Sequence, residues 1–123
     1  MPPHILVADD DDLNREVMEA FLSSENYRVS LAHDGRQTIE FSASLNPDLI
    51  LLDVNMPDMT GYDVCRYLRQ QPNTATTPIV IVTGYDTAQD RETGLAAGAN
   101  VFLPRPFTAQ RLLQLVADLL KKS

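Results

Sequence analysis

The sequence is poor in the residues that staple small proteins together. It has a single cysteine, Cys65, among 123 residues, and no tryptophan. One thiol excludes an internal disulfide and a multi-cysteine zinc site, and it suits a reducing compartment. At this length a single domain, which we expect to span residues 1–123, can bury an adequate core without such staples.

Long apolar runs and clusters of basic residues are also missing. No stretch approaches the roughly 18 apolar residues of a membrane-spanning helix, and no basic segment followed by an apolar one marks a leader. We therefore expect a soluble, cytoplasmic chain without a membrane partner. Ten basic residues against 17 acidic ones give a net charge of −7. That balance disfavours direct binding of nucleic acid, because phosphate contacts need clustered lysine and arginine.

The sequence instead alternates short apolar runs with segments of helical periodicity. The runs at 48–54 and 78–84 are almost wholly apolar, which is typical of strands covered on both faces. In the first helical segment the spacing places Leu13, Val17, Ala20, Phe21 and Ser24 on one face. The expected strands span 4–8, 27–32, 48–54, 78–84 and 100–104, and the expected helices span 13–24, 35–45, 62–70, 87–99 and 108–122.

Five strand–helix pairs with short connections predict an α/β fold: one doubly wound (βα)5 domain with a five-stranded parallel sheet and helices on both faces. The common strand order for five such units is 2-1-3-4-5, as in flavodoxin-like folds. Ligands of open α/β sheets bind outside the carboxyl ends of the strands, at the point where the order reverses. The residues just after the first and third strands are therefore the first place to look for a site.

Acidic side chains follow both of these strands. The first strand runs into ADDDD and the third into LLDVNMPD, so Asp9 or Asp10 should converge with Asp53. Close carboxylates repel one another and raise at least one pKa unless a cation neutralises them. A half-open site with oxygen ligands suits Mg²⁺, which keeps several of its waters. With Thr83 at the end of the fourth strand and Arg105 after the fifth, these groups form a phosphoryl-binding set.

Four segments in register carry a family resemblance: ILVADDDD, PDLILLDVNMPDMTGYDV, PIVIVTG and FLPRPF. Over essentially its whole length the chain resembles the receiver domain of two-component response regulators. The resemblance implies that Asp53 is the phosphoacceptor, receiving a phosphoryl group from a histidine kinase or phosphotransfer protein. It also implies that Asp9 and Asp10 organise Mg²⁺ together with Asp53 and the backbone carbonyl of Asn55.

The same resemblance assigns roles on the fourth and fifth strands. Thr83 matches the hydroxyl residue that bonds the phosphoryl group, Phe102 matches the aromatic switch position, and a cis bond is implied between Arg105 and Pro106. Phosphorylation would reshape the surface at about 87–121 to control a partner protein, an output domain or a homodimer. Such a domain is a signalling switch rather than an enzyme, since it catalyses only its own phosphotransfer and dephosphorylation.

Arg105 departs from the family, which usually carries lysine at this position. A guanidinium is planar and forked, whereas an ammonium is a compact point charge. Arg105 either clamps the phosphoryl group, or it pairs permanently with Asp53 or Asp10 and weakens phosphorylation. The second interpretation describes a phosphorylation-independent pseudo-receiver that acts as an interaction module. Tyr85, two residues after Thr83, is predicted to shield the path of hydrolytic water and to slow the loss of phosphate.

Two other classes of protein fit the residues less well. A phosphohydrolase of the haloacid-dehalogenase type places a second acid two residues after its nucleophile, where this chain has Asn55. A flavodoxin-like cofactor binder needs a phosphate loop after the first strand, where four aspartates at 9–12 would repel the phosphate of FMN. The residues leave open the cognate kinase, the output partner, and whether the chain is free-standing or part of a hybrid kinase.

Overall fold

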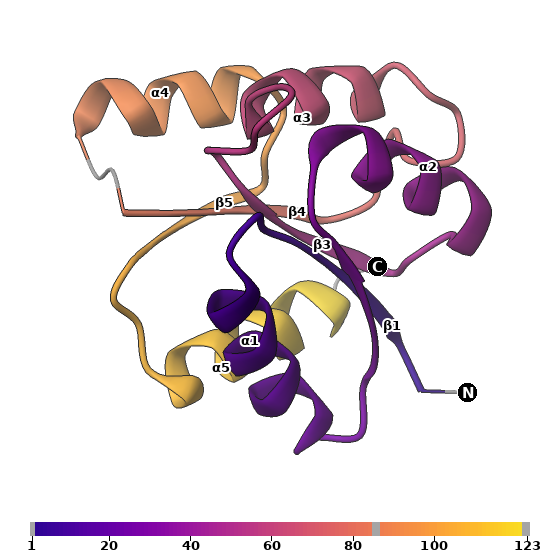
Figure 1. Cartoon of the computed structure of the whole chain (residues 1–123), viewed down its shortest axis with the longest axis vertical. Helices are drawn as coiled ribbons and strands as arrows, with labels where there is room; N and C mark the ends of the chain where they lie inside the picture. The colour runs from indigo at the N-terminus through magenta and orange to yellow at the C-terminus, as the bar shows by residue number, and fades with distance from the viewer. Residues whose placement is uncertain (1, 85–86, 122–123) are drawn as a thin grey trace.

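Strands and helices alternate along the whole chain, which the computed structural model describes at residues 2–84 and 87–121 (Figure 1). The ten expected elements are confirmed over these residues, and their ends differ by at most one residue except at α4, which ends at Ala96 instead of residue 99. The strands are β1 (His4–Ala8), β2 (Arg28–Ala32), β3 (Leu49–Asp53), β4 (Ile79–Thr83) and β5 (Val101–Pro104). The helices are α1 (Asp12–Ser23), α2 (Gly35–Leu45), α3 (Gly61–Arg69), α4 (Ala88–Ala96) and α5 (Ala109–Lys121).

The strands form a parallel sheet in the order β2-β1-β3-β4-β5, which confirms the predicted topology. In this register Ala8 pairs with Leu52, and Thr83 pairs with Pro104. The carboxyl ends of β1, β3, β4 and β5 therefore meet at one edge of the sheet. The switch point lies between β1 and β3, where the sequence analysis places the site.

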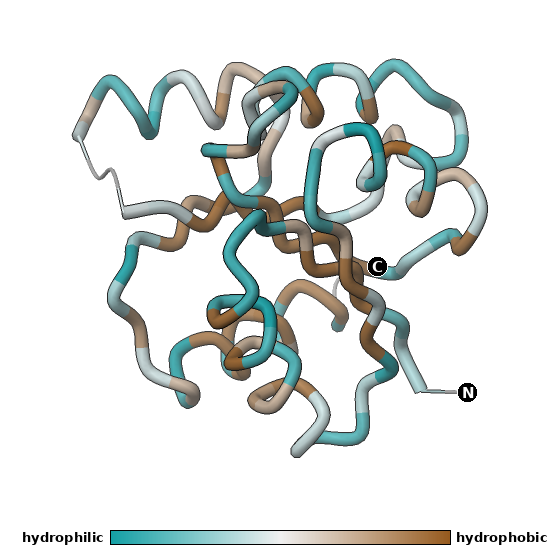
Figure 2. Tube along the Cα trace, in the orientation of Figure 1, coloured by the Kyte–Doolittle hydropathy of each residue, from teal (hydrophilic) through white to brown (hydrophobic). Residues whose placement is uncertain are grey.

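Helices cover both faces of the sheet. Helices α1 and α5 lie on one face, and α2, α3 and α4 lie on the other (Figure 1). Alternate residues of a strand enter different cores: Leu6 and Leu52 pack with α3, whereas Val7 and Leu51 pack with α1 and α5. The hydrophobic segments accordingly run through the centre of the molecule (Figure 2). None of the helices in the described part of the chain is long and apolar enough to cross a membrane.

The buried side of α1 differs from the face that the sequence pattern indicates. Leu13 and Val17 are exposed, at 64% and 40%, whereas Met18 and Leu22 are buried. The buried stripe begins with Arg15, which lies one turn before Met18 and donates a hydrogen bond to the backbone of the β1–α1 connection. A pattern that counts only apolar residues overlooks this stripe, because a charged residue begins it.

One arginine connects three segments at the end of the sheet opposite the acids. Arg69, the last residue of α3, donates to the carbonyls of Gly98, Thr74 and Thr77 and to the side chain of Asn100, over distances of 2.7–2.9 Å. Gly98 has φ +107°, and a Cβ there would lie 2.6 Å from Cγ of Arg69. This left-handed residue, packed against Arg69, follows α4 closely and accounts for the early end of that helix.

We expect Arg69→Ala to lower the free energy of unfolding by about 2 kcal/mol, because a partly buried, charge-assisted hydrogen-bond network is lost. The matched control is Arg66→Ala on the same helix. Arg66 pairs with Asp63, one turn away on an exposed surface, so we expect a change of about 0.5 kcal/mol or less. Urea unfolding of both variants measures the difference. Equal losses would contradict a structural role for Arg69.

Candidate functional site

Three carboxylates converge where the ends of β1 and β3 lie side by side. Asp9 follows β1 and is fully buried, Asp53 ends β3 and is 7% exposed, and Asp10 lies open to solvent. One oxygen from each of them lies within 4.8 Å of the other two. The sequence left open whether Asp9 or Asp10 meets Asp53, and the structure brings both to it.

Arg105 reaches into this cluster from the end of β5. Its backbone NH donates to the carbonyl of Thr83 at 2.7 Å, which fixes the start of the segment. Its Nη2 donates to Oδ2 of Asp9 at 2.5 Å, and its Nη1 donates to Oδ1 of Asp53 at 3.3 Å. The peptide bond to Pro106 is cis. The guanidinium therefore bridges Asp53 and Asp9, and not Asp10, which the sequence analysis named as its second possible partner.

Asp9 is held on its other sides by the turn that starts α1. Its Oδ1 accepts from the backbone NH of Asp11 at 2.9 Å. Its backbone carbonyl accepts from Nη1 of Arg15 at 2.6 Å, and Arg15 also pairs with Asp12. Sequence reasoning missed Arg15. The available signal was an arginine in line with Met18 and Leu22 at helical spacing, just after an acidic run.

The buried position of Asp53 changes its acidity. The pKa of Asp53 is raised to about 6, first by burial and second by the neighbouring Asp9 carboxylate. Arg105 opposes this rise, as does the backbone NH of Val54, which donates to Oδ1 at 2.9 Å. One guanidinium thus offsets only part of the repulsion between these carboxylates. An additional hard cation would relieve the rest, and the oxygen donors fit Mg²⁺.

The loop after Asp53 is closed by its own backbone. The NH of Gly61 donates to the carbonyl of Val54 at 2.8 Å, and Asn55 forms a short antiparallel bridge with Thr60. A Cβ on Gly61 would lie 2.2 Å from the carbonyl oxygen of Asp53, so only glycine allows this close approach. The backbone carbonyl of Asn55 stays a predicted metal ligand.

A second carboxylate ties this loop to α2. The side chain of Asp58 accepts from the backbone NH groups of Gly35 and Arg36 at 2.8 and 2.9 Å, and these bonds lower the pKa of Asp58. The first turn of α2 is thus capped from a distant loop as well as by its own N-cap residue, Asp34. Sequence reasoning assigned Asp34 as the cap and missed Asp58, because its partners lie more than 20 residues away.

The two predicted switch residues lie on neighbouring strands. Thr83, at the end of β4, is 1% exposed, and Phe102 on β5 is half-buried. The guanidinium of Arg91 lies 5.8 Å from the centre of the Phe102 ring, and a Cβ on Gly94 would lie 3.4 Å from its Cδ1. The ring of Phe102 is therefore in contact with α4. Tyr85, predicted to shield the phosphate, lies outside the described residues.

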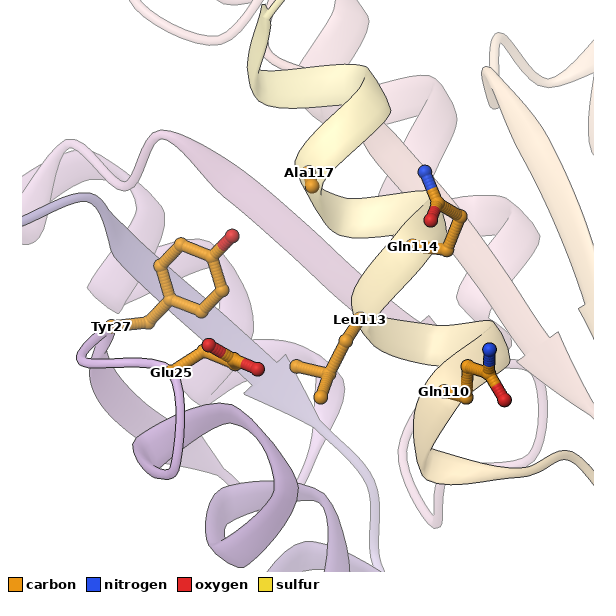
Figure 3. A pocket seen from close by; sticks show the side chains of 6 residues that line it. All are labelled: Glu25, Tyr27, Gln110, Leu113, Gln114 and Ala117. Carbon is orange, nitrogen blue, oxygen red and sulfur yellow. The ribbon is translucent and has the colours of Figure 1, made fainter.

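A hollow of about 570 Å³ lies apart from the acids, between α5 and the segment after α1 (Figure 3). Polar side chains surround its apolar floor, and burial together with Glu25 raises the pKa of Tyr27. Its lining consists of Glu25, Tyr27, Gln110, Leu113, Gln114 and Ala117. No predicted site residue is among them, so the acidic cluster is the candidate site.

The chain is thus a small α/β domain of a recognisable class. Carboxylates and a basic group lie together at the carboxyl ends of its parallel strands, where such folds bind ligands. The profile of the response regulator receiver domain matches residues 5–117, and the chain belongs to this family. Receiver domains act in two-component signal transduction and are signalling proteins rather than classical enzymes. The chain is 42% identical over 123 residues to the response regulator MprA of Mycolicibacterium vanbaalenii, covering 100% of this chain and 52% of that protein. It thus spans about half the length of the curated relatives it matches.

Solved structures agree with the family assignment. A response regulator from Chloroflexus aurantiacus superposes with a TM-score of 0.94 at 34% identity, covering 98% of this chain and 99% of that one. The receiver domain of the sensor histidine kinase PA1611 from Pseudomonas aeruginosa superposes with a TM-score of 0.92 at 34% identity, with coverage of 98% and 99%. That receiver domain was crystallised with a magnesium ion coordinated in its active site cleft.

We expect Asp53→Asn to stabilise the metal-free protein near pH 7.5 and to have little effect near pH 4. The pKa of Asp53 rises from 3.8 to about 6 in the fold, so the folded state binds this proton more tightly than the unfolded state does. The contribution of Asp53 to the stability of the native chain therefore falls as the pH rises from about 4 to about 6. A shift of about two pKa units corresponds to about 3 kcal/mol at most, and screening in a partly open site reduces it to about 1–2 kcal/mol.

Urea unfolding in EDTA at several pH values measures this difference. Subtracting the native curve from the variant curve removes the contributions of groups that both proteins share. A difference that stays constant between pH 4 and pH 7.5 would show that Asp53 titrates normally in the fold.

Proposed function

We propose that this chain is a phosphorylation-dependent signalling switch in which Asp53 accepts a phosphoryl group from a histidine kinase or phosphotransfer protein. The observation that carries the proposal is the convergence of Asp9, Asp10 and Asp53 within 4.8 Å, with Arg105 bridging two of them. The family supports phosphorylation as the signal. The buried acceptor, the basic group and the neighbouring hydroxyl support Asp53 as the place where it occurs.

In this proposal the carboxylate of Asp53 is the nucleophile. With a pKa of about 6 it is largely ionised at neutral pH. One of its oxygens forms a bond to phosphorus while the bond from phosphorus to the donor's histidine nitrogen breaks, and the electron pair stays on that nitrogen. Arg105 and Thr83 would hold phosphoryl oxygens, so catalysis rests on position and charge. Mg²⁺, when held by Asp9, Asp10, Asp53 and the carbonyl of Asn55, would neutralise the charge on the transferring group.

The response would travel along β4 and β5 to α4. Thr83 and Phe102 lie on these adjacent strands, and α4 packs against β5. A second hollow of about 570 Å³ borders Phe102, and Arg91, Arg111, Phe107 and two prolines are among the residues that line it. A change at Phe102 would alter this surface, which we assign to binding an output partner, an output domain or a second copy of the chain.

The pairing of Arg105 with both Asp9 and Asp53 favours a second candidate function. In a phosphorylation-independent pseudo-receiver, the guanidinium would neutralise the acids permanently and the domain would act by binding alone. In either case the partners of the whole protein are proposals, since the chain spans about half of its curated relatives. The expectation of no nucleic-acid binding applies to residues 1–123 only.

Intact mass after incubation with Mg²⁺ and an acyl phosphate distinguishes the two functions. We expect the native chain and Arg105→Lys each to gain one phosphoryl group and Asp53→Asn to gain none, because the acceptor carboxylate is absent. Addition to Arg105→Lys but not to the native chain would establish the pseudo-receiver. Addition to Asp53→Asn at the native level would exclude Asp53 as the acceptor.

Thr83→Ala tests the path to the surface separately from phosphorylation. We expect this variant still to gain the phosphoryl group, but to lose most of the phosphorylation-induced change in hydrogen exchange over 88–104. The reason is that the hydroxyl that draws β4 toward the phosphoryl group is gone. Hydrogen exchange of the native and variant chains, with and without the acyl phosphate, measures the effect. A full response in Thr83→Ala would place the coupling elsewhere.

A further inference from the structure

The guanidinium of Arg105 occupies carboxylates that the proposed function assigns to Mg²⁺. Its two terminal nitrogens reach separate acids, at 2.5 Å from Oδ2 of Asp9 and 3.3 Å from Oδ1 of Asp53. A planar fork can span two acceptors in this way, whereas the single ammonium of a lysine acts as a point charge. The positive charge of Arg105 thus lies between the two acids, where the proposed function places the metal ion.

Arg105 already uses one oxygen of Asp9 and one of Asp53, two of the acids that the ion would share. Oδ1 of Asp9 accepts from the backbone NH of Asp11, and Asp9 is fully buried, so Oδ2 is the oxygen that Arg105 uses. Oδ1 of Asp53 likewise accepts from both Val54 and Arg105. A divalent ion on the same oxygens would lie at contact distance from a guanidinium in a partly buried site, where like charges repel strongly.

We propose that Arg105 and Mg²⁺ exchange on Asp9 and Asp53, so that Arg105 sets the affinity of the site for the ion. The proposal rests on the proposed function, because it takes these acids as the Mg²⁺ ligands. In the metal-free protein Arg105 neutralises the acids and stabilises the fold. When the ion binds, the guanidinium leaves Oδ2 of Asp9 and becomes available to a phosphoryl group on Asp53.

Titration calorimetry with Mg²⁺ tests the exchange without any phosphorylation. We expect Arg105→Lys, which keeps the charge but not the fork, to bind Mg²⁺ about tenfold more tightly than the native chain, the effect of losing one charge-assisted contact. Arg105→Gln should bind at least as tightly as Arg105→Lys. In EDTA, Arg105→Gln should unfold at lower urea than the native chain, and Mg²⁺ should raise its midpoint more.

Arg15 provides the matched control, because it also contacts Asp9 but through the backbone carbonyl. Arg15→Gln removes the same charge from the same neighbourhood without releasing a side-chain oxygen of Asp9 or Asp53; the carboxylate that it frees is the exposed one of Asp12. We expect its Mg²⁺ affinity to stay within about twofold of the native value, as for a charge that acts only at a distance. In the native chain, the Nε–H resonance of Arg105 should shift on titration with Mg²⁺ as the guanidinium leaves Asp9.

The outcomes separate this proposal from the proposed function. Equal gains in affinity in Arg15→Gln and Arg105→Gln would overturn the exchange in favour of general repulsion, and equal affinities in all the chains would also overturn it. If no chain binds Mg²⁺, both the exchange and the metal part of the proposed function are wrong. If affinities change as expected but Asp53 accepts no phosphoryl group, the exchange stands and the proposed switch fails.

Discussion

The site depends on one constraint: the carboxylates of Asp9 and Asp53 repel each other at the carboxyl end of the sheet, where both are buried. Asp9 and Asp53 end adjacent parallel strands, so the backbone ladder brings them together whatever their charges. Residues 5–8 and 49–52, which precede them, are buried and apolar, so little water reaches the acids from below. A basic group is therefore needed beside them, and the fifth strand supplies Arg105. The pKa of Asp53 nevertheless stays raised, because burial and Asp9 together outweigh the effect of Arg105.

The segments around the acids are fixed, whereas the surface beyond β5 is more loosely held. Gly61 closes the loop after β3 against the carbonyl of Asp53, and Asp58 ties that loop to α2. Helix α4, in contrast, contains Gly94, and its hydrogen bond with α3, from the hydroxyl of Tyr62 to the carbonyl of Asp90, is long at 3.3 Å. Glycine lowers helix stability, so α4 is the element that changes with least opposition. A rigid site beside a softer helix suits a switch.

Local pattern was enough to predict the elements, the strand order and the meeting of Asp53 with Asp9 or Asp10, because strand period and the switch-point rule need no long-range information. Other features depend on contacts that no window of sequence contains. The buried face of α1 is set by Arg15, which an apolar count leaves out. The choice of Asp9 over Asp10 as the partner of Arg105 depends on the turn that places Asp10 in solvent.

Arginine in place of lysine links charge neutralisation to the response of β5. A phosphoryl group on Asp53 would carry more negative charge than the carboxylate and would extend further from β3. A guanidinium that bridges Asp9 and Asp53 would then have a stronger acceptor on one side only, and its fork would turn away from Asp9. Arg105 lies three residues after Phe102, directly after β5, and its backbone NH donates to the carbonyl of Thr83. A movement of the Arg105 side chain would therefore affect both predicted switch positions, Thr83 and Phe102. The family's usual lysine, a point charge on a flexible stem, would transmit this movement less directly.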